Sequence, residues 1–179
     1  MSDDSDAALV FQCRGGDRQA FEVLLTRYER QVFGAAFRIL NNREDATDVT
    51  QTAFLRAYEH LDRYDPDQPF SSWVYRIAVN EALDLVRGRQ RSEPLLDDAP
   101  TDWPGPDAMA TQEENAAAVQ NALMALNIDY RTLIVLKHFQ ECSYEEIALV
   151  LEIPVKTVKS RLFTARQALR EEMAARGLI

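Results

Sequence analysis

Residues 143–163 read SYEEIALVLEIPVKTVKSRLF, and this stretch decides the fold of the second half of the chain. Ser143, followed three residues later by Glu146, forms the capping-box pattern that opens a helix. The residues from Glu152 to Pro154 predict a tight turn, and proline suits the first position of the helix that follows. Two helices joined by such a turn predict a helix-turn-helix.

The helix that begins near Val155 has two different faces. One is a narrow apolar stripe that must face a core, formed by Val155, Val158, Leu162, Ala165 and Leu169. The opposite face offers donors for phosphates and base edges, namely Lys156, Lys159, Ser160 and Phe163, with Arg161 and Arg166 at its edges. An aromatic ring among bases indicates contact with thymine methyls or sugars. The alternative is a solvated basic helix with Phe163 packed on a neighbour.

A second face suited to DNA is expected on a helix from about Phe70 to Arg91. Its outer stripe consists of Trp73, Arg76, Asn80, Asp84, Arg87 and Arg91, and its inner side of Val74, Ala78, Ala82 and Leu85. An aromatic ring, an amide and guanidinium groups on one face suit melted single-stranded DNA, because bases stack on rings and the backbone meets positive charge. Alternatively, Trp73 belongs to the core.

The remaining apolar spacing is helical as well. Helices are expected at about 21–39, ended by Asn41 and Asn42, and at 44–61, 119–126 and 130–140, the last capped by Asp129. The helix at 44–61 carries a polar stripe on which one apolar residue also lies; the stripe consists of Asp45, Asp48, Gln51, Thr52 and Leu55. An apolar residue on such a stripe hints at a protein partner.

The net charge of −9 is unfavourable for a DNA-binding protein, but it is unevenly distributed. Residues 92–114 hold seven acids and no Lys or Arg, whereas residues 76–91 and 152–179 carry a net positive charge. Residues 93–111 are also rich in proline, which predicts an extended linker. The sequence therefore predicts an all-α protein of two small helical domains, 1–92 and 112–179, joined by a flexible acidic linker, 93–111.

Several classes of function are disfavoured. No stretch is long and apolar enough for a membrane span, so membrane insertion is not expected and a cytoplasmic location is the default. Cys13 and Cys142 lie far apart without metal-ligand spacing, so buried thiols are expected, with a redox role as the alternative. His60 and His138 have no catalytic partners around them, and no Gly-rich phosphate loop occurs. No enzyme activity, cofactor or metal is expected.

Three strings resemble the extracytoplasmic-function subfamily of bacterial sigma factors of the sigma-70 type. They are EDATDVTQ at 44–51 with Phe54 and Leu55, FSSWVYRIAVN at 70–80 with Asp84 and Arg87, and SYEEIA at 143–148 with TVKSRL at 157–162. Three such strings in order, separated by a linker, are a specific signal. The resemblance implies a protein that binds RNA polymerase core and directs it to promoter DNA.

The resemblance also implies roles for individual residues. The first domain is similar to sigma region 2, which binds a coiled coil of the polymerase beta-prime subunit, here through Asp45, Asp48, Gln51, Thr52 and Leu55. Residues 65–71 and the helix after them would recognise and melt the minus-ten element, which adds Phe70 and Ser71 to that face. The second domain resembles region 4, which reads the minus-thirty-five element, here with Thr157 added, and touches the beta flap. An anti-sigma factor is an expected partner, and the acidic connector can act as a nucleic-acid mimic.

Three positions depart from the family pattern. Glu152 stands in the turn where glycine is frequent, so the left-handed backbone conformation is no longer easy. Lys156 replaces a second glycine, and Thr47 replaces an acid. The main alternative is a one-component helix-turn-helix transcription regulator with an N-terminal sensor or dimerisation domain, which leaves the face at 73–91 and the stripe near Asp48 unexplained.

Overall fold

The computed structural model describes residues 5–92 and 110–179, and no strand occurs in these two ranges. The elements in chain order are α1 (Asp6–Arg14), α2 (Arg18–Leu40), α3 (Arg43–Glu59), a 3-10 turn η1 (Leu61–Arg63), α4 (Phe70–Ser92), α5 (Ala110–Ala125), α6 (Ile128–Ile134), a π-helical turn η2 (Val135–Phe139), α7 (Tyr144–Leu151) and α8 (Val155–Ala175). The all-α prediction is confirmed. Residues 93–109 of the expected linker lie outside the described residues.

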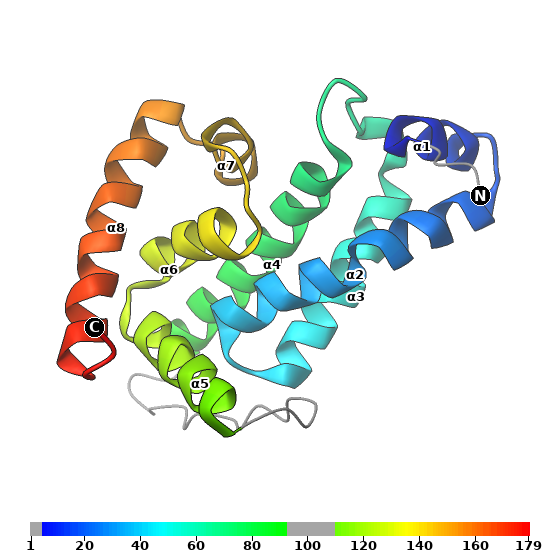
Figure 1. Ribbon diagram of the computed structural model, residues 1–179. Helices are drawn as coiled ribbons and strands as arrows, with labels where there is room; N and C mark the ends of the chain where they lie inside the picture. Colours follow the sequence, from blue (N-terminus) through cyan, green and yellow to red (C-terminus); the bar gives the residue numbers. More distant parts are fainter. Residues whose placement is uncertain (1–4, 93–109) are drawn as a thin grey trace.

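The first four helices form one unit. Helices α2, α3 and α4 pack against one another, and α1 packs on α2 (Figure 1). The asparagine pair ends α2 as expected: Asn41 adopts the left-handed conformation at the C-cap, and the Asn42 side chain caps α3 by accepting from the Asp45 amide at 3.1 Å. Helix α1 was not predicted from the sequence. At its end, the guanidinium of Arg14 donates to the carbonyls of Leu61 and Tyr64 at 2.6 and 2.7 Å.

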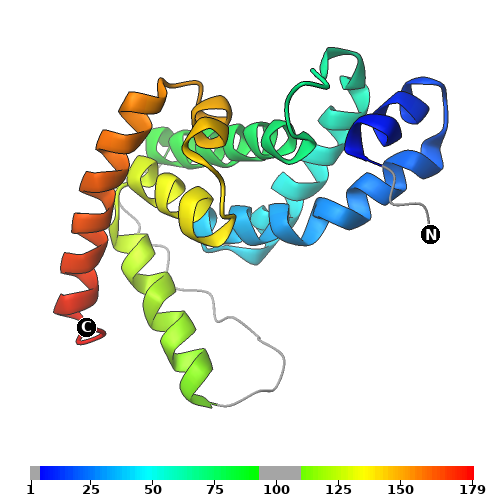
Figure 2. The same ribbon diagram turned by 45° about the horizontal axis from the view of Figure 1, so that its top comes forward.

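Helices α5 to α8 form the second unit. Helix α8 packs on α5, α6 and α7 and lies at the opposite end of the molecule from α1 in both views (Figures 1 and 2). The predicted cap of α6 was wrong by two residues: Asn127 is the N-cap and accepts from the Tyr130 amide at 2.9 Å. Asp129 lies instead in the first turn of α6, where its negative charge interacts favourably with the positive end of the helix dipole.

The two units pack against each other and share one apolar core. Helix α4 packs on α7, while α2 packs on α5, α6 and η2 (Figure 2). Arg131, only 8% exposed, lies at the junction of α5, α6 and the end of α2. Its guanidinium donates to Leu123, Met124 and Leu126 within its own unit at 2.9–3.1 Å, and to the carbonyl of Ile39 at 2.7 Å.

Both cysteines are buried and free, as the sequence interpretation expected of idle thiols. Burial raises the pKa of the Cys142 thiol to about 11, with a further rise from Glu146. Burial also raises the pKa of Cys13. Because the thiolate is the reactive form, both side chains are poor nucleophiles near neutral pH.

Replacing Arg131 by lysine should destabilise the chain strongly. An ammonium lacks the planar fork and cannot serve four carbonyls at once, so we expect the free energy of unfolding in urea to fall by about 2–3 kcal/mol. The exposed change Arg170→Lys is the control and should stay within about 0.5 kcal/mol. Equal stability of the two variants would contradict the central role of the guanidinium.

Candidate nucleic-acid interface

The helix-turn-helix predicted from residues 143–163 is formed by α7, the turn and α8. Both halves of the capping box are present: the Glu146 amide donates to Ser143 Oγ at 3.1 Å, and the Ser143 amide donates to the Glu146 carboxylate at 2.6 Å. The sequence pattern places Pro154 at the first helical position of α8. In the structure Pro154 is the N-cap, and Val155 is the first helical residue. The Pro154 carbonyl accepts from the amides of Thr157 and Val158.

The turn adopts the left-handed backbone conformation although its residue is glutamate rather than glycine. Glu152 has φ 54° and ψ 40°, in the left-handed region, and its amide donates to the carbonyl of Ala148. This conformation costs a residue with a Cβ roughly 1–2 kcal/mol. The Glu152 side chain, which is 70% exposed, reaches α4 and lies 3.6 Å from Arg76 Nη1.

Helix α8 presents the two faces that its sequence predicts. Val158, Leu162 and Ala165 are fully buried, whereas Phe163 is 62% exposed. The other exposed candidates for contact with DNA are Lys156, Lys159, Ser160, Arg161 and Arg166. Thr157 is half-buried. The alternative in which Phe163 packs on a neighbour does not hold in this structure.

Two of the exposed cations on α8 have neighbours in the same unit. Lys159 Nζ lies 5.6 Å from the centre of the Tyr144 ring, which Lys137 also approaches, at 5.0 Å. Arg166 donates to His138 Nε2 at 3.2 Å. Burial, Arg166 and Lys137 all lower the pKa of His138, so its imidazole is neutral at pH 7 and can accept this hydrogen bond.

Helix α4 only partly matches its predicted DNA face. Asn80, Asp84 and Arg87 are exposed, Arg76 and Ser71 are half-buried. Phe70 and Trp73 are 0% and 6% exposed, so the expectation that they face DNA is not met in this structure, and the alternative that Trp73 belongs to the core is confirmed. Their rings pack with each other, and each also packs on Tyr64, at centroid distances of 5.4–5.8 Å. The side chain of Arg91 lies outside the described residues.

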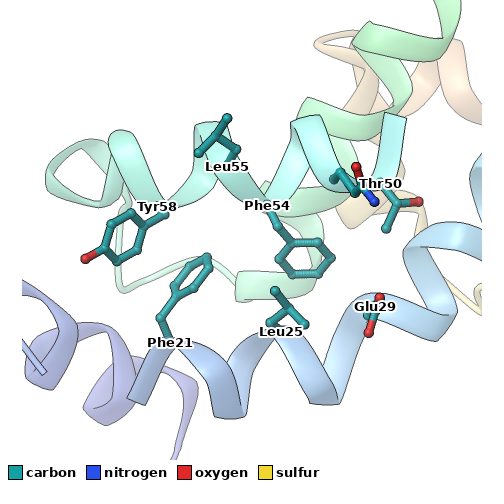
Figure 3. Close-up of a pocket in the computed structure, with 8 residues that line it drawn as sticks. Phe21, Leu25, Glu29, Thr50, Phe54, Leu55 and Tyr58 are labelled. Atoms are coloured by element: carbon teal, nitrogen blue, oxygen red, sulfur yellow. The ribbon is translucent and has the colours of Figure 1, made fainter. Parts of the chain in front are cut away.

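The polar stripe of α3 borders an apolar groove that sequence reasoning missed (Figure 3). Asp48, Gln51 and Leu55 are exposed, whereas Asp45 is held by Arg89 through two hydrogen bonds of 2.7 and 2.9 Å; Thr52 is half-buried. The groove, of about 310 Å³, is lined by Phe21, Leu25, Glu29, Thr50, Gln51, Phe54, Leu55 and Tyr58. The signal for it was available, because Tyr58 follows Leu55 by three residues and so continues the stripe.

Family models match both units. The model for sigma-70 region 2 matches residues 24–92, and that for sigma-70 region 4 matches residues 116–169. Among curated proteins, the RNA polymerase sigma-H factor of Pseudomonas aeruginosa is 34% identical, with 94% of each chain covered. The extracytoplasmic-function (ECF) sigma factor SigW of Bacillus subtilis is also 34% identical, over 92% of this chain and 94% of SigW. The chain belongs to the ECF sigma factors. Such a sigma factor binds RNA polymerase and directs it to specific promoters, and the family is not a class of enzymes.

Solved structures agree with this assignment. The sigma factor resembles CnrH, solved in complex with the cytosolic domain of CnrY, with a TM-score of 0.76 and 31% identity over 96% of this chain and 99% of CnrH. It shares its fold with RpoE of Bartonella quintana, solved with the anti-sigma factor NepR, at a TM-score of 0.74 and 23% identity over 86% and 96% of the two chains. The match of residues 24–92 to region 2 argues against an N-terminal sensor domain.

Other kinds of site were sought in the described parts of the sigma factor. Within 5–92 and 110–179, no helix has the length and apolar character needed to cross a membrane. In the same residues, no group of three or more His, Cys, Asp or Glu side chains is arranged to hold a metal ion.

Ser143→Ala should weaken the helix-turn-helix of this sigma factor. Without the hydroxyl the Glu146 amide loses its acceptor, and the free energy of unfolding should fall by about 1 kcal/mol. Thermal or urea denaturation measures this loss. Ser143→Thr keeps the hydroxyl and should retain most of the stability; an equal loss in both variants would mean that the cap is not the cause.

Proposed function

We propose that this sigma factor reads the minus-thirty-five element with the exposed face of α8, the minus-ten element with the outer face of α4, and binds the polymerase core through α3 and the groove beside it. The observation that carries this proposal is α8 itself. It combines an apolar stripe, fully buried at Val158, Leu162 and Ala165, with exposed lysines and arginines and with Phe163, which is 62% exposed. Donors and an apolar ring on one helix face suit the major groove, where bases present acceptors and thymine methyls.

On α4 the candidates with solvent-exposed side chains are Asn80, Asp84 and Arg87, joined by the half-buried Arg76. They lie at steps of three and four and therefore share one face of the helix. An amide and guanidinium groups suit the bases and phosphates of a melted strand. Phe70 and Trp73 support this face from within, because their aromatic cluster fixes the start of α4.

The core-binding surface combines polar and apolar contacts. Asp48 and Gln51 offer a carboxylate and an amide, and beside them Leu55 and Tyr58 are 58% and 40% exposed. Apolar side chains at the mouth of a groove, with polar side chains at its rim, are typical of a protein interface. The amphipathic coiled coil of the beta-prime subunit is the occupant that we propose.

The remaining assignments follow from the same proposal. We assign residues 1–92 to core binding and the minus-ten element, 112–179 to the minus-thirty-five element and the beta flap, and 93–111 to an acidic connector. Polymerase is cytoplasmic, so we place the chain there. A partner with the role that NepR has for RpoE, an anti-sigma factor, is proposed for this chain as well.

The two DNA faces should be separable by mutation. Lys159→Ala and Arg161→Ala each remove a donor for duplex DNA, so promoter binding by the reconstituted holoenzyme should weaken by roughly three- to tenfold in footprinting titrations. The control Arg18→Ala removes one exposed charge from the start of α2 and should leave binding unchanged. The promoters for these titrations are first identified by in vitro transcription of a genomic fragment library with purified core and this sigma factor.

Asn80→Ala should act at a different step. The loss of the amide should lower open-complex formation by roughly three- to tenfold, measured by permanganate reactivity of unpaired thymines, with the closed complex largely kept. Asn121→Ala, an exposed amide on α5, is the control. If footprints and open complexes were the same for the Lys159, Arg161 and Asn80 variants, the division of roles would be wrong.

Leu55→Asp should impair binding of core. A carboxylate placed at the groove mouth loses apolar contact and would be desolvated on docking, so we expect affinity for purified core to fall by about tenfold or more. Val23→Asp is the matched control. Val23 is 46% exposed on α2, but it lies on the opposite side of that helix from Phe21 and Leu25, which line the groove. Unchanged affinity of the Leu55 variant, with native circular dichroism, would remove the groove from the interface.

A further inference from the structure

Helix α1 is held on α2 from its first residue onward. The Asp6 carboxylate accepts hydrogen bonds from the Arg27 guanidinium and the Tyr28 hydroxyl of α2. Leu9 and Val10, in the middle of α1, are 3% and 2% exposed in the common core. The last residue of α1 therefore extends its side chain from a fixed position.

That last residue, Arg14, contacts the backbone of the segment before α4. Its Nε and Nη2 atoms donate to the Leu61 carbonyl at 2.9 and 2.6 Å, and Nη2 also donates to the carbonyls of Asp62 and Tyr64 at 3.3 and 2.7 Å. Helix α1 lies beside η1 in both views (Figures 1 and 2). Because a guanidinium is planar and its donors have fixed directions, contacts with three carbonyls fix this turn relative to α1.

The loop at 64–69, between η1 and α4, is ordered by its own hydrogen bonds. The Tyr64 hydroxyl donates to the carbonyl of Gln68 at 2.6 Å. The Asp65 carboxylate accepts from the amide of Asp67 at 3.0 Å and from the Gln68 side chain at 3.3 Å. A loop with these internal contacts keeps its shape, so its orientation depends on how its ends are held.

Tyr64 links the loop to α4 and to α1. Its ring is 4% exposed and packs on Phe70 and Trp73, at the start of α4, at centroid distances of 5.7 and 5.4 Å. Its carbonyl accepts from Arg14. Because the acceptor is a backbone carbonyl, the contact with Arg14 constrains the path of the chain whatever side chains the loop carries.

The tip of the loop is the part that a ligand can reach. Asp65, Pro66, Asp67 and Pro69 are exposed, whereas Tyr64 before them is buried. A loop that is already ordered loses little conformational freedom when it binds. The orientation of the loop therefore decides which groups of a ligand its tip can contact.

We infer that Arg14 is a positioning residue for recognition of the minus-ten element: by fixing the turn before the loop, it sets the orientation of the tip and thereby the bases that the sigma factor selects. The inference rests on the proposed reading of the minus-ten element by the first unit, in which the resemblance to region 2 assigns residues 65–71 to that element. In this role Arg14 acts through the loop and touches no base or phosphate itself.

The order of the loop is measured on the full chain by hydrogen–deuterium exchange with mass spectrometry. Arg14→Ala and Arg14→Lys should each speed exchange in peptides that cover 64–69 by about three- to tenfold, with exchange in α8 unchanged. Arg14 is exposed, so neither change leaves a cavity. The control Arg18→Ala removes an exposed charge from the start of α2 and should leave the loop unaltered. Unchanged exchange in both Arg14 variants would overturn the inference.

Selection of bases is measured with the reconstituted holoenzyme on a promoter library in which the minus-ten element is randomised and the minus-thirty-five element is constant. Arg14→Ala should reduce the preference for the favoured base by about three- to tenfold at one or more minus-ten positions, with affinity for core within about twofold. Val32→Ala is the control for lost stability, because it opens a cavity in the core of the same unit and leaves Arg14 in place. If Val32→Ala relaxes selection as much, lost stability is the cause and the inference is wrong.

Arg14→Lys separates positioning from a direct contact of Arg14 with phosphate. Lysine keeps the positive charge but has no planar fork for three carbonyls, so positioning predicts relaxed selection, as in Arg14→Ala. Selection restored by lysine would mean that charge is sufficient, and the positioning role would be excluded.

The double variant Pro66→Gly, Asp67→Gly loosens the tip directly and leaves Arg14 unaltered. If it relaxes selection and Arg14→Ala does not, the inference is wrong and the proposed reading of the minus-ten element stands. If the double variant itself selects as the unaltered chain does, the role of residues 65–71 in that reading fails, while hydrogen exchange still decides whether Arg14 holds the loop.

Discussion

The buried guanidinium of Arg131 ties the corner of the second unit to the end of α2 in the first. Burying a charged group is unfavourable unless its donors are satisfied, and here four carbonyls accept from it. Three belong to the corner between α5 and α6, and the fourth, from Ile39, is among the carbonyls that the end of α2 leaves without a partner inside its own helix. One domain thereby completes the hydrogen bonding of the other, and neither end is satisfied alone.

Helix α4 combines structural and recognition roles because its circumference is divided. Its inner stripe belongs to the three-helix core, α7 also packs on α4, and Asn80, Asp84 and Arg87 are exposed to solvent. The aromatic cluster around Phe70 holds the start of the helix rigid. Side chains on a rigid helix lose little conformational freedom on binding, which favours recognition of a strand that is itself flexible.

Features that depend on residues close together in the sequence could be predicted. The capping box at Ser143 and the exposed face with Phe163 follow from short-range spacing, and both are present. Other features depend on contacts between distant segments. Trp73 has the spacing of an outer residue but is buried because Tyr64, from the loop before α4, packs on it. Tyr75 of α4 is 3% exposed and donates to Gln140 of the other unit, a contact that local spacing does not reveal. The sequence pattern places the cap of α6 at Asp129, but α6 begins two residues earlier than predicted, so Asn127 is the cap.

The first helix shows that the folding unit is larger than the stretch that the region 2 model matches. The region 2 match begins at residue 24, yet Leu9 and Val10 of α1 are 3% and 2% exposed in the common core. Arg14 holds the backbone of Leu61 and Tyr64, which leads into the loop before α4. Helix α1, which precedes the stretch matched by the region 2 model, thus braces the entry to the helix that we assign to promoter melting. A change in α1 would therefore reach the loop before α4 without altering any residue that we assign to DNA.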